Sequence, residues 1–235
     1  MIPSYGPRKR VERRRNFGGR AAEHQYNRDE MTTSASTPRL RVTLLWYLCL
    51  LLLTAVTRSA PLPVLLRGAL DLLALLTIVA ACLGRVWCSV FIAGRKDAEL
   101  VTNGPYALCR HPLYTLSLLG GVGLGLATHS LTLTVATLVV QGVLFSRAAR
   151  EEERFMTARF DVRYERYREQ TPQFWPRRWP TRGWRPFVPE NLEVRPLILW
   201  KSFVDAGSFA LLYALVNIAV LWRDFAGLPK VFVLP

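Results

Sequence analysis

Two short clusters of polar residues lie at the edges of apolar segments and carry groups that can do chemistry. The first, in GPYALCRHPLY, places Arg110 and His111 directly before Pro112. A guanidinium and an imidazole beside the free amide groups of a helix start can hold a carboxylate. The second, in REEERF, places Glu152 and Glu153 after another apolar run. Such carboxylates can bind an ammonium group or take a proton.

Each cluster also has a plainer interpretation. An Arg-His pair at a membrane edge is often an interfacial charge whose long side chain extends to water. Acidic residues in the first turn of a helix often only complement the helix dipole. Neither cluster alone therefore identifies a binding site.

Five apolar segments must position these clusters. They comprise residues 42–56, about 68–88, 113–128, 131–145 and 203–222. Each is apolar around most of a helix circumference, which is typical of membrane helices. Only the second and the last approach the roughly 20 residues that span a bilayer unaided. The sequence predicts an all-α bundle of about five transmembrane helices.

The local sequence around both clusters predicts further structure. Gly104 and two prolines predict an ordered loop over residues 103–112 that caps the third helix. After the fourth apolar segment, the acidic cluster is predicted to begin a separate amphipathic helix. In that helix Phe160, Tyr164 and Tyr167 share one face with Glu153. Glu152 would point about a quarter turn away.

The basic residues predict the orientation. Most of the 31 Lys and Arg residues precede residue 42 or lie between residues 147 and 201. By the positive-inside rule, the N-terminus, the 95–111 loop and the 147–201 segment face the cytoplasm. His129 and the C-terminus then face the other compartment. The net charge of +14 requires no nucleic-acid partner, because anionic lipid headgroups suit a basic arm.

Four parts of the chain are predicted. They are a basic, disordered arm over residues 1–41, two helices over 42–93, a core with both clusters over 94–180, and a Pro/Trp-rich interfacial linker with the last helix over 181–235. Met31 is a second plausible start, so whether residues 1–30 belong to the native product stays open. The four cysteines lack metal-ligand spacing, and no metal site is predicted.

Charges and glycines inside the apolar segments receive structural interpretations. Arg67 and Asp71, four residues apart, are predicted to pair near the outer face. Arg85 is expected to extend to the inner face, and Asp205 requires a protein partner or lipid headgroups. The glycines of LGGVGLGLA are expected to allow close helix packing.

Together the two clusters resemble the shared core of the isoprenylcysteine carboxyl methyltransferase and phospholipid methyltransferase superfamily. LVTNGPYALCRHPLY resembles the motif Leu-Val-x-x-Gly-Pro-Tyr-x-x-x-Arg-His-Pro-x-Tyr. EERFMTARFDVRYERYREQTPQFWP resembles the second motif, which reads Glu-Glu-x-x-Leu, Phe-Gly and Tyr-x-x-Tyr. The resemblance covers about residues 94–176. It implies a membrane methyltransferase with a cytoplasmic S-adenosylmethionine site and a lipophilic acceptor that enters from the bilayer.

The resemblance also implies roles for individual residues. The cofactor-binding set would be Tyr106, Arg110, His111, Pro112, Tyr114, Glu152, Glu153 and Tyr164. Its catalytic members would be Arg110, His111, Glu152 and Glu153. Arg and His suit the carboxylate of the cofactor, Glu suits its ammonium group or ribose hydroxyls, and tyrosine faces suit its sulfonium. A carboxylate acceptor requires no base, whereas an amine acceptor would pass a proton to one of the glutamates or to the imidazole.

The sequence departs from the family pattern in three places. Met156 replaces a leucine, Asp161 replaces a glycine, and Thr115 with Leu116 stands where a small residue is common. The first change is conservative. The second puts a tight turn in doubt, although Asp tolerates turn conformations. The third could alter how closely the third helix packs beside the cofactor.

Two other classes of function stay open. One is a nicotinamide-dependent reductase of the steroid-reductase-like membrane fold, against which the Glu-Glu pair favours S-adenosylmethionine. The other is a non-catalytic membrane scaffold, against which the intact motifs argue. The sequence leaves open the acceptor, the choice among O-, N- and S-methylation, and the oligomeric state.

Overall fold

The computed structural model describes residues 41–59, 61–92, 99–176, 196–225 and 232–234. The chain divides into two units, Met1–Trp46 and Tyr47–Pro235. Of the first unit, residues 41–46 are described, and they are helical. The predictions for the N-terminal arm, and most of the Pro/Trp-rich linker, lie outside the described residues. All packing presented below is within the second unit.

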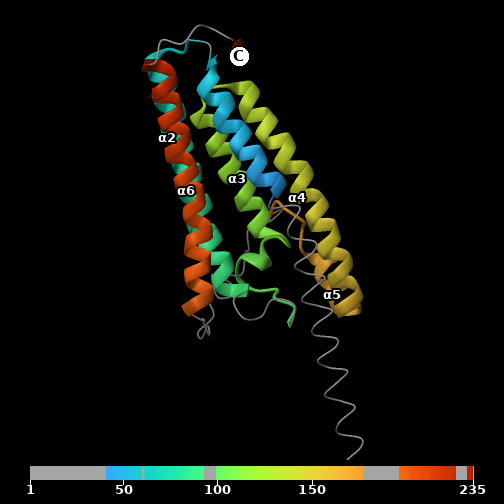
Figure 1. Cartoon of the computed structure of the whole chain (residues 1–235). Coiled ribbons are helices and arrows are strands. Elements are labelled where there is room, and N and C mark those ends of the chain that lie inside the picture. Colours follow the sequence, from blue (N-terminus) through green and yellow to red (C-terminus); the bar gives the residue numbers. More distant parts are fainter. Residues whose placement is uncertain (1–40, 60, 93–98, 177–195, 226–231, 235) are drawn as a thin grey trace, which may run out of the picture. The chain divides into compact units, whose positions relative to one another are not determined.

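The described chain is helical, as the all-α prediction expects (Figure 1). The helices are Arg41–Val56, α2 (Val64–Ile92), α3 (Pro112–Ala127), α4 (Leu131–Phe160), α5 (Val162–Gln170) and α6 (Pro196–Phe225), with a 3-10 turn η1 over Gly104–Ala107. Two three-residue strands, β1 (Thr57–Ser59) and β2 (Phe232–Leu234), pair in parallel.

Among the described residues, three helices are long and apolar enough to cross a membrane: α2, α4 and the Leu199–Phe225 part of α6. They indicate an integral membrane protein. The helix Arg41–Val56 and α3 are apolar but shorter. With 16 residues, α3 extends about 24 Å, which is less than a hydrocarbon core of about 30 Å. All five predicted segments are thus helical, and three of them meet the length of a span.

The fourth helix differs from the prediction. We expected a membrane helix over residues 131–145 and a separate amphipathic helix after it, but α4 runs without a break for 30 residues to Phe160. Residues 143–160 contain no glycine or proline, so no helix-breaking residue ends the helix after the apolar segment. The break comes at Asp161, which has a φ of 45° and separates α4 from α5. The acidic cluster therefore belongs to a membrane helix.

α3 packs against α2, α4 and α6. Its glycines face these three neighbours: Gly123 faces α2, Gly121 and Gly125 face α4, and Gly120 faces α6. A Cβ at any of the four would come within 3.0 Å of a neighbouring helix. The packing interpretation of these glycines is confirmed, and they place α3 at the centre of the bundle.

Charged residues far from both clusters pair differently from the prediction. Arg67 Nη2 donates to Asp224 Oδ2 at 2.6 Å, and Asp71 Oδ1 lies 2.6 Å from His129 Nε2. The predicted pair of Arg67 with Asp71 is wrong, because α6 and the α3–α4 turn present other partners. The two contacts connect the start of α2 to α6 and to that turn.

Candidate functional site

The basic cluster lies in a short ordered loop before α3. Gly104 has a φ of 61°, and a Cβ there would overlap the ring of Phe91, so both the turn and the close contact require glycine. His111 is the N-cap residue of α3. Pro112 is its first residue, where the missing N–H has no helical partner to lose. The predicted loop over residues 103–112 is confirmed.

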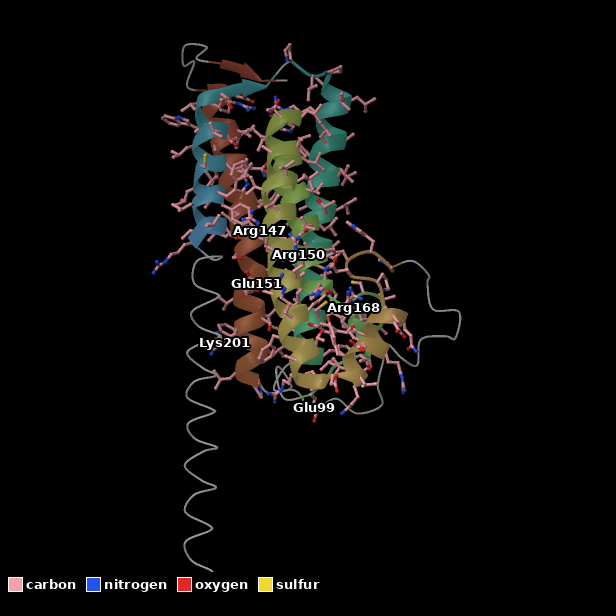
Figure 2. The ribbon with its side chains drawn as sticks, turned by 90° about the vertical axis from the view of Figure 1, so that its right-hand side faces the viewer. Glu99, Arg147, Arg150, Glu151, Arg168 and Lys201 are labelled. Atoms are coloured by element: carbon pink, nitrogen blue, oxygen red, sulfur yellow. The ribbon has the colours of Figure 1, made fainter. Side chains whose placement is uncertain are left out.

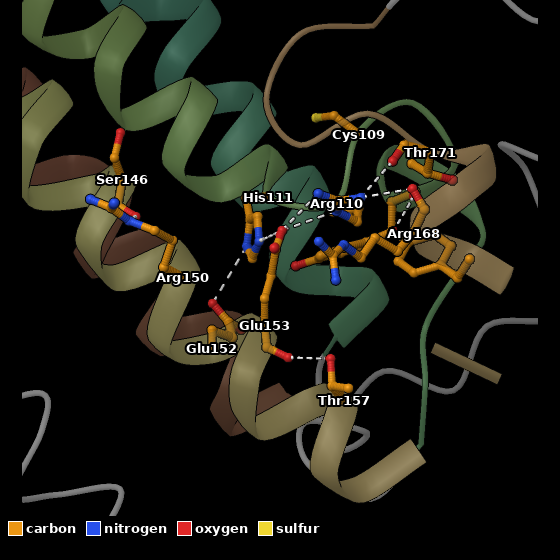
Figure 3. A network of polar contacts seen from close by, with 12 residues as sticks. Cys109, Arg110, His111, Ser146, Arg150, Glu152, Glu153, Thr157, Arg168 and Thr171 are labelled. Atoms are coloured by element: carbon orange, nitrogen blue, oxygen red, sulfur yellow. Dashed lines mark hydrogen bonds and ion pairs between the residues drawn. The ribbon is translucent and has the colours of Figure 1, made fainter. Parts of the chain in front are cut away.

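The acidic cluster on α4 meets this loop through one carboxylate oxygen. Glu153 Oε1 lies 3.0 Å from Arg110 Nε and 2.9 Å from Arg110 Nη2. The same oxygen lies 3.1 Å from His111 Nε2 (Figure 3). Glu152 Oε2 lies 3.6 Å from the other ring nitrogen, Nδ1. Both nitrogens of the imidazole thus face carboxylates, and the fold joins two clusters that are 42 residues apart.

The remaining donors of the Arg110 guanidinium go to the end of α5. Nη1 donates to the carbonyl oxygens of Arg168 at 2.8 Å and Thr171 at 3.1 Å. The backbone amides of Arg110 and His111 donate to the carbonyls of Pro172 and Gln173. Arg110 and its salt-bridge partner have side chains only 11% and 14% exposed. Arg110 therefore holds α4 and the end of α5 around the loop.

Three tyrosines, Tyr106, Tyr164 and Tyr167, line the same pocket as Glu152. Tyr167 Oη donates to the backbone carbonyl of Tyr106 at 2.6 Å. The Tyr106 hydroxyl is buried and has no hydrogen-bond partner among the described residues. Burial raises the pKa of Tyr164 to about 12, and the nearby Glu153 carboxylate adds to the shift. Burial also raises the pKa of Tyr106 and Tyr167 well above the usual tyrosine range. All three hydroxyls stay neutral at physiological pH.

Aromatic rings contact the imidazole. The His111 ring stacks on Tyr114, with centroids 5.6 Å apart and planes at 22°. Tyr114 stacks in turn on Phe145 of α4, with centroids 5.5 Å apart. The ring of Phe174 lies 5.9 Å from the imidazole centroid. Tyr114 thus positions His111 by stacking.

A cavity of about 450 Å³, part of it open to solvent, lies between these groups. The lining residues are Ile92, Glu99, Leu100, Val101, Tyr106, Arg110, His111, Glu152, Met156, Tyr164 and Tyr167. Five of the eight predicted site residues are among them. Glu153 lies behind Arg110 and His111, Pro112 begins α3, and Tyr114 stacks on the imidazole.

The predicted site residues do not include six of the lining residues: Ile92, Glu99, Leu100, Val101, Met156 and Tyr167. Tyr167 could have been predicted from the sequence, because it follows Tyr164 by three residues in the same short helix. Met156 lies one turn after Glu152 on α4. Glu99 precedes the Leu-Val pair of the first motif, and Ile92 ends α2. No local pattern marks Ile92 as a pocket residue, because only the packing of α2 brings it to the cavity.

The departures from the family pattern are accommodated. Asp161 adopts the positive φ that a glycine would allow, so the tight turn forms. Thr115 Oγ1 donates to the Phe174 carbonyl at 2.9 Å and holds the segment after α5. Leu116 packs on the face of α2 where Gly84 leaves room. Met156 lines the cavity.

The site offers groups for binding and proton transfer. Cys109 adjoins the cluster, but burial raises the pKa of its thiol, which disfavours the nucleophilic thiolate. The lining residues present neutral phenols, an imidazole, carboxylates and a guanidinium. This set suits a zwitterionic ligand with hydroxyl groups and a cationic centre.

Comparisons with known proteins match part of the chain. Residues 70–163 match the family model described as "Phospholipid methyltransferase". A stretch of 77 residues is 32% identical to the protein-S-isoprenylcysteine O-methyltransferase of Schizosaccharomyces pombe, covering 33% of each chain. No solved structure matches this chain.

Two further relatives carry names from metal resistance. A stretch of 105 residues is 43% identical to the cobalt-zinc-cadmium resistance protein CzcN of Cupriavidus metallidurans, covering 45% of this chain and 48% of that protein. A stretch of 112 residues is 38% identical to the nickel-cobalt-cadmium resistance protein NccN of Alcaligenes xylosoxydans xylosoxydans, covering 48% of this chain and 52% of that protein. The matches span about half the length of these relatives.

Proposed function

Since the chain belongs, through residues 70–163, to the phospholipid methyltransferase family, we propose that it is a membrane methyltransferase that uses S-adenosylmethionine. The observation that carries the proposal is the contact between the Arg110–His111 pair and the Glu152–Glu153 pair at one wall of a cavity. The acceptor is a lipophilic carboxylate or amine, and the reaction is O- or N-methylation accordingly.

The cavity residues fit the chemical groups of S-adenosylmethionine. The unpartnered Tyr106 hydroxyl is a buried polar group that a ribose or adenine atom of the ligand would satisfy. Glu152 suits the ammonium group, and the positive charge of Arg110, whose donors mostly bind the protein itself, suits the carboxylate at longer range. The neutral rings of Tyr106 and Tyr164 suit a sulfonium through their π faces. When bound, the cofactor would supply an electrophilic methyl group to the acceptor.

The residues of the chain then act by position and by holding a proton. Arg110 and Glu153 fix the loop against α4, and the Tyr114–Phe145 stack fixes the imidazole. Such positioning lowers the entropic part of the barrier. For an amine acceptor, Glu152 or His111 at the cavity would hold the released proton. Glu153 is less available, because its Oε1 is engaged by Arg110 and His111. A carboxylate acceptor releases no proton.

We place the site on the cytoplasmic side of the membrane. Arg147 and Arg150 of α4 and Lys201 of α6 are exposed basic residues of the segments that lead to and from the site region (Figure 2). Basic residues next to membrane helices favour the cytoplasm and contact anionic headgroups. An acceptor entering sideways from the bilayer would meet the cofactor at this boundary.

Binding of S-adenosylhomocysteine to the purified protein in detergent tests the proposal. We expect Tyr106→Phe to weaken binding by about 3- to 10-fold, since one neutral hydrogen bond of about 0.5–1.5 kcal/mol is lost. Its thermal stability should not fall, because the hydroxyl has no hydrogen-bond partner among the residues that the structure describes. The matched variant Tyr167→Phe removes a protein hydrogen bond and should lower thermal stability instead. Equal affinity in Tyr106→Phe and wild type would contradict the assignment of the cavity.

The same measurement separates the other classes of function. Stabilisation by a nicotinamide dinucleotide phosphate, without stabilisation by S-adenosylhomocysteine, would indicate the reductase. Stabilisation by neither would indicate the scaffold. Incubation of membranes with methyl-deuterated S-adenosylmethionine, followed by mass spectrometry of the lipids, would identify the acceptor.

The relatives named for metal resistance suggest a physiological setting. The 43% identity to CzcN over 105 residues is the observation that favours it. Growth on cobalt, zinc and cadmium salts, with and without the gene, tests this setting. An active-site variant such as Glu153→Gln should behave like the deletion if methyl transfer contributes to resistance.

A further inference from the structure

Arg85 lies within the apolar helix α2, on the face that contains the cavity residue Ile92 and the fully buried Cys88. Seven residues separate Arg85 from Ile92, which corresponds to about 10 Å along a helix. Arg85 is therefore about two turns deeper in the bundle than the cavity wall. An ionisable side chain at such a position is costly and is commonly functional.

The Arg85 guanidinium is held between three helices. Its Nη1 donates to Ser117 Oγ of α3 and, at 3.4 Å, to the carbonyl oxygen of Leu113. Its Nη2 donates to Asp205 Oδ2 of α6. The guanidinium carbon also lies 5.3 Å from the ring centroid of Phe209. These contacts fix the cation beside the first turns of α3, close to the basic cluster.

The hydrogen-bonding capacity of this guanidinium is only partly used. The buried Nε has no hydrogen-bond partner among the described residues. Nε and Nη2 together form the edge of a guanidinium that can receive a carboxylate or phosphate through two parallel hydrogen bonds. At that edge the described structure has one bond, from Nη2 to Asp205. A buried donor without a partner is a cost that a second acceptor oxygen would remove.

The two partners of this ion pair differ in their surroundings. The Arg85 side chain is 14% exposed, whereas the Asp205 side chain is 61% exposed. Asp205 thus approaches the guanidinium from the open side of the bundle, where α6 packs on α2. Its exposed carboxylate has room to turn toward the lipid headgroups, which can accommodate an acidic side chain, while the cation stays in place. The Arg85 guanidinium is therefore a fixed cationic binding group, and the anion that occupies it can be exchanged.

We propose that Arg85 binds the anionic group of an amphiphilic methyl acceptor, a carboxylate or a phosphate, and that Asp205 occupies the guanidinium until the acceptor replaces it. The inference rests on the proposed function for the identity of this ligand as the acceptor. It narrows the acceptor class to anionic amphiphiles that enter between α2 and α6. Phe209 and the apolar surfaces of the two helices would contact the hydrocarbon part.

A fluorescent fatty acid tests this site without any methyl transfer. The full chain in an uncharged maltoside detergent is titrated with cis-parinarate and, separately, with its methyl ester, which lacks the charge. We expect the carboxylate to bind at least about 10-fold more tightly than the ester, in line with a charge-assisted hydrogen bond. Competition by dodecyl phosphate distinguishes a site for both anions from one selective for carboxylates, and either result supports the proposal.

Two substitutions decide between a binding site and a structural ion pair. Arg85→Gln should weaken parinarate binding by about 10-fold or more, whereas Asp205→Asn should tighten it by about 2- to 5-fold, since a competing carboxylate of modest pairing energy is removed. A structural pair predicts that both substitutions loosen the bundle and weaken binding. Lys201 lies one turn before Asp205 on α6. Lys201→Gln removes one positive charge, as Arg85→Gln does, and as the control it should leave the affinity unchanged.

Outcomes for this site and for the proposed function are separable. S-Adenosylhomocysteine binding in each variant reports whether the cofactor cavity is intact. If Arg85→Gln does not fold, the sign of the Asp205→Asn effect decides alone. Weaker parinarate binding in Asp205→Asn, or equal binding of the acid and its ester, would overturn the proposal. If the wild-type protein does not bind S-adenosylhomocysteine, this result would instead contradict the methyltransferase assignment.

Discussion

Arg110 Nη2 and Glu153 Oε1 lie 2.9 Å apart, although 43 residues separate them in the sequence. Both side chains are nearly buried, and His111 shares the same carboxylate oxygen. Because Arg110 also binds two carbonyls at the end of α5, one guanidinium connects α4, α5 and the loop before α3. This ion pair sets the distance between the two motifs and hence the width of the cavity.

The first prediction concerns this ion pair. Glu153→Gln should lower the stability by about 3–5 kcal/mol, because it leaves a nearly buried guanidinium without a counter-charge. It should also weaken S-adenosylhomocysteine binding by about 10-fold or more, since the cavity wall loses a charge-assisted contact of about 1.5–3 kcal/mol. Calorimetric titration and thermal unfolding in detergent measure the two effects. Glu151→Gln, at an exposed position two residues earlier, is the control. Wild-type values in both variants would show that the pair is dispensable.

The second prediction concerns the turn between α4 and α5. Asp161 has a φ of 45° and a ψ of −127°, and its side chain makes no capping hydrogen bond. Asp161→Gly should raise the stability by about 1 kcal/mol, because glycine adopts positive φ without the steric cost that other residues have. Asp161→Ala keeps that cost and should bring no gain. Thermal unfolding of the two variants side by side separates the backbone effect from loss of the carboxylate. A gain in the alanine variant would point to charge instead.

The third prediction concerns alkaline pH. The pKa of Tyr164 is raised to about 12 in the folded protein, whereas an unfolded tyrosine titrates near pH 10. The folded state therefore resists deprotonation. Its contribution to stability is complete below about pH 10 and is lost as the pH rises toward 12. Absorbance of phenolate near 295 nm, in wild type and Tyr164→Phe, should reveal a step above pH 11 that the variant lacks. If the step that Tyr164→Phe removes lies near pH 10 instead, this would contradict the burial of the hydroxyl.

The fourth prediction concerns orientation. Pro61 lies in the connection between the first apolar helix and α2, and Glu99 lies beside the cavity; both are exposed. In a chain without its native cysteines, an impermeant maleimide should label Pro61→Cys from outside intact cells and Glu99→Cys only after permeabilisation. These positions suit labelling better than His129, whose side chain is 6% exposed. Labelling of Glu99→Cys in intact cells would reverse the assigned orientation.

The sequence alone predicted those features that depend on neighbouring residues. Apolar runs predicted where helices lie, because burial or contact with lipid is required along the whole run. Gly104 and Pro112 predicted the loop and the start of α3, because their backbone preferences are local. The spacing of both motifs indicated the family. The length of α4 was misjudged, because its change from apolar to polar residues was mistaken for a helix end.

Only the tertiary structure decided which side chains meet. Arg67 binds Asp224 of α6 instead of Asp71 in its own helix, and Arg85 binds Asp205. Arg110, which the sequence assigned to a ligand carboxylate, directs most of its donors to the protein itself. A charge pairs with whichever counter-charge lies within a few ångströms, since the interaction weakens with distance and solvent screening. Sequence separation does not determine that distance; the packing of α3 among α2, α4 and α6 does.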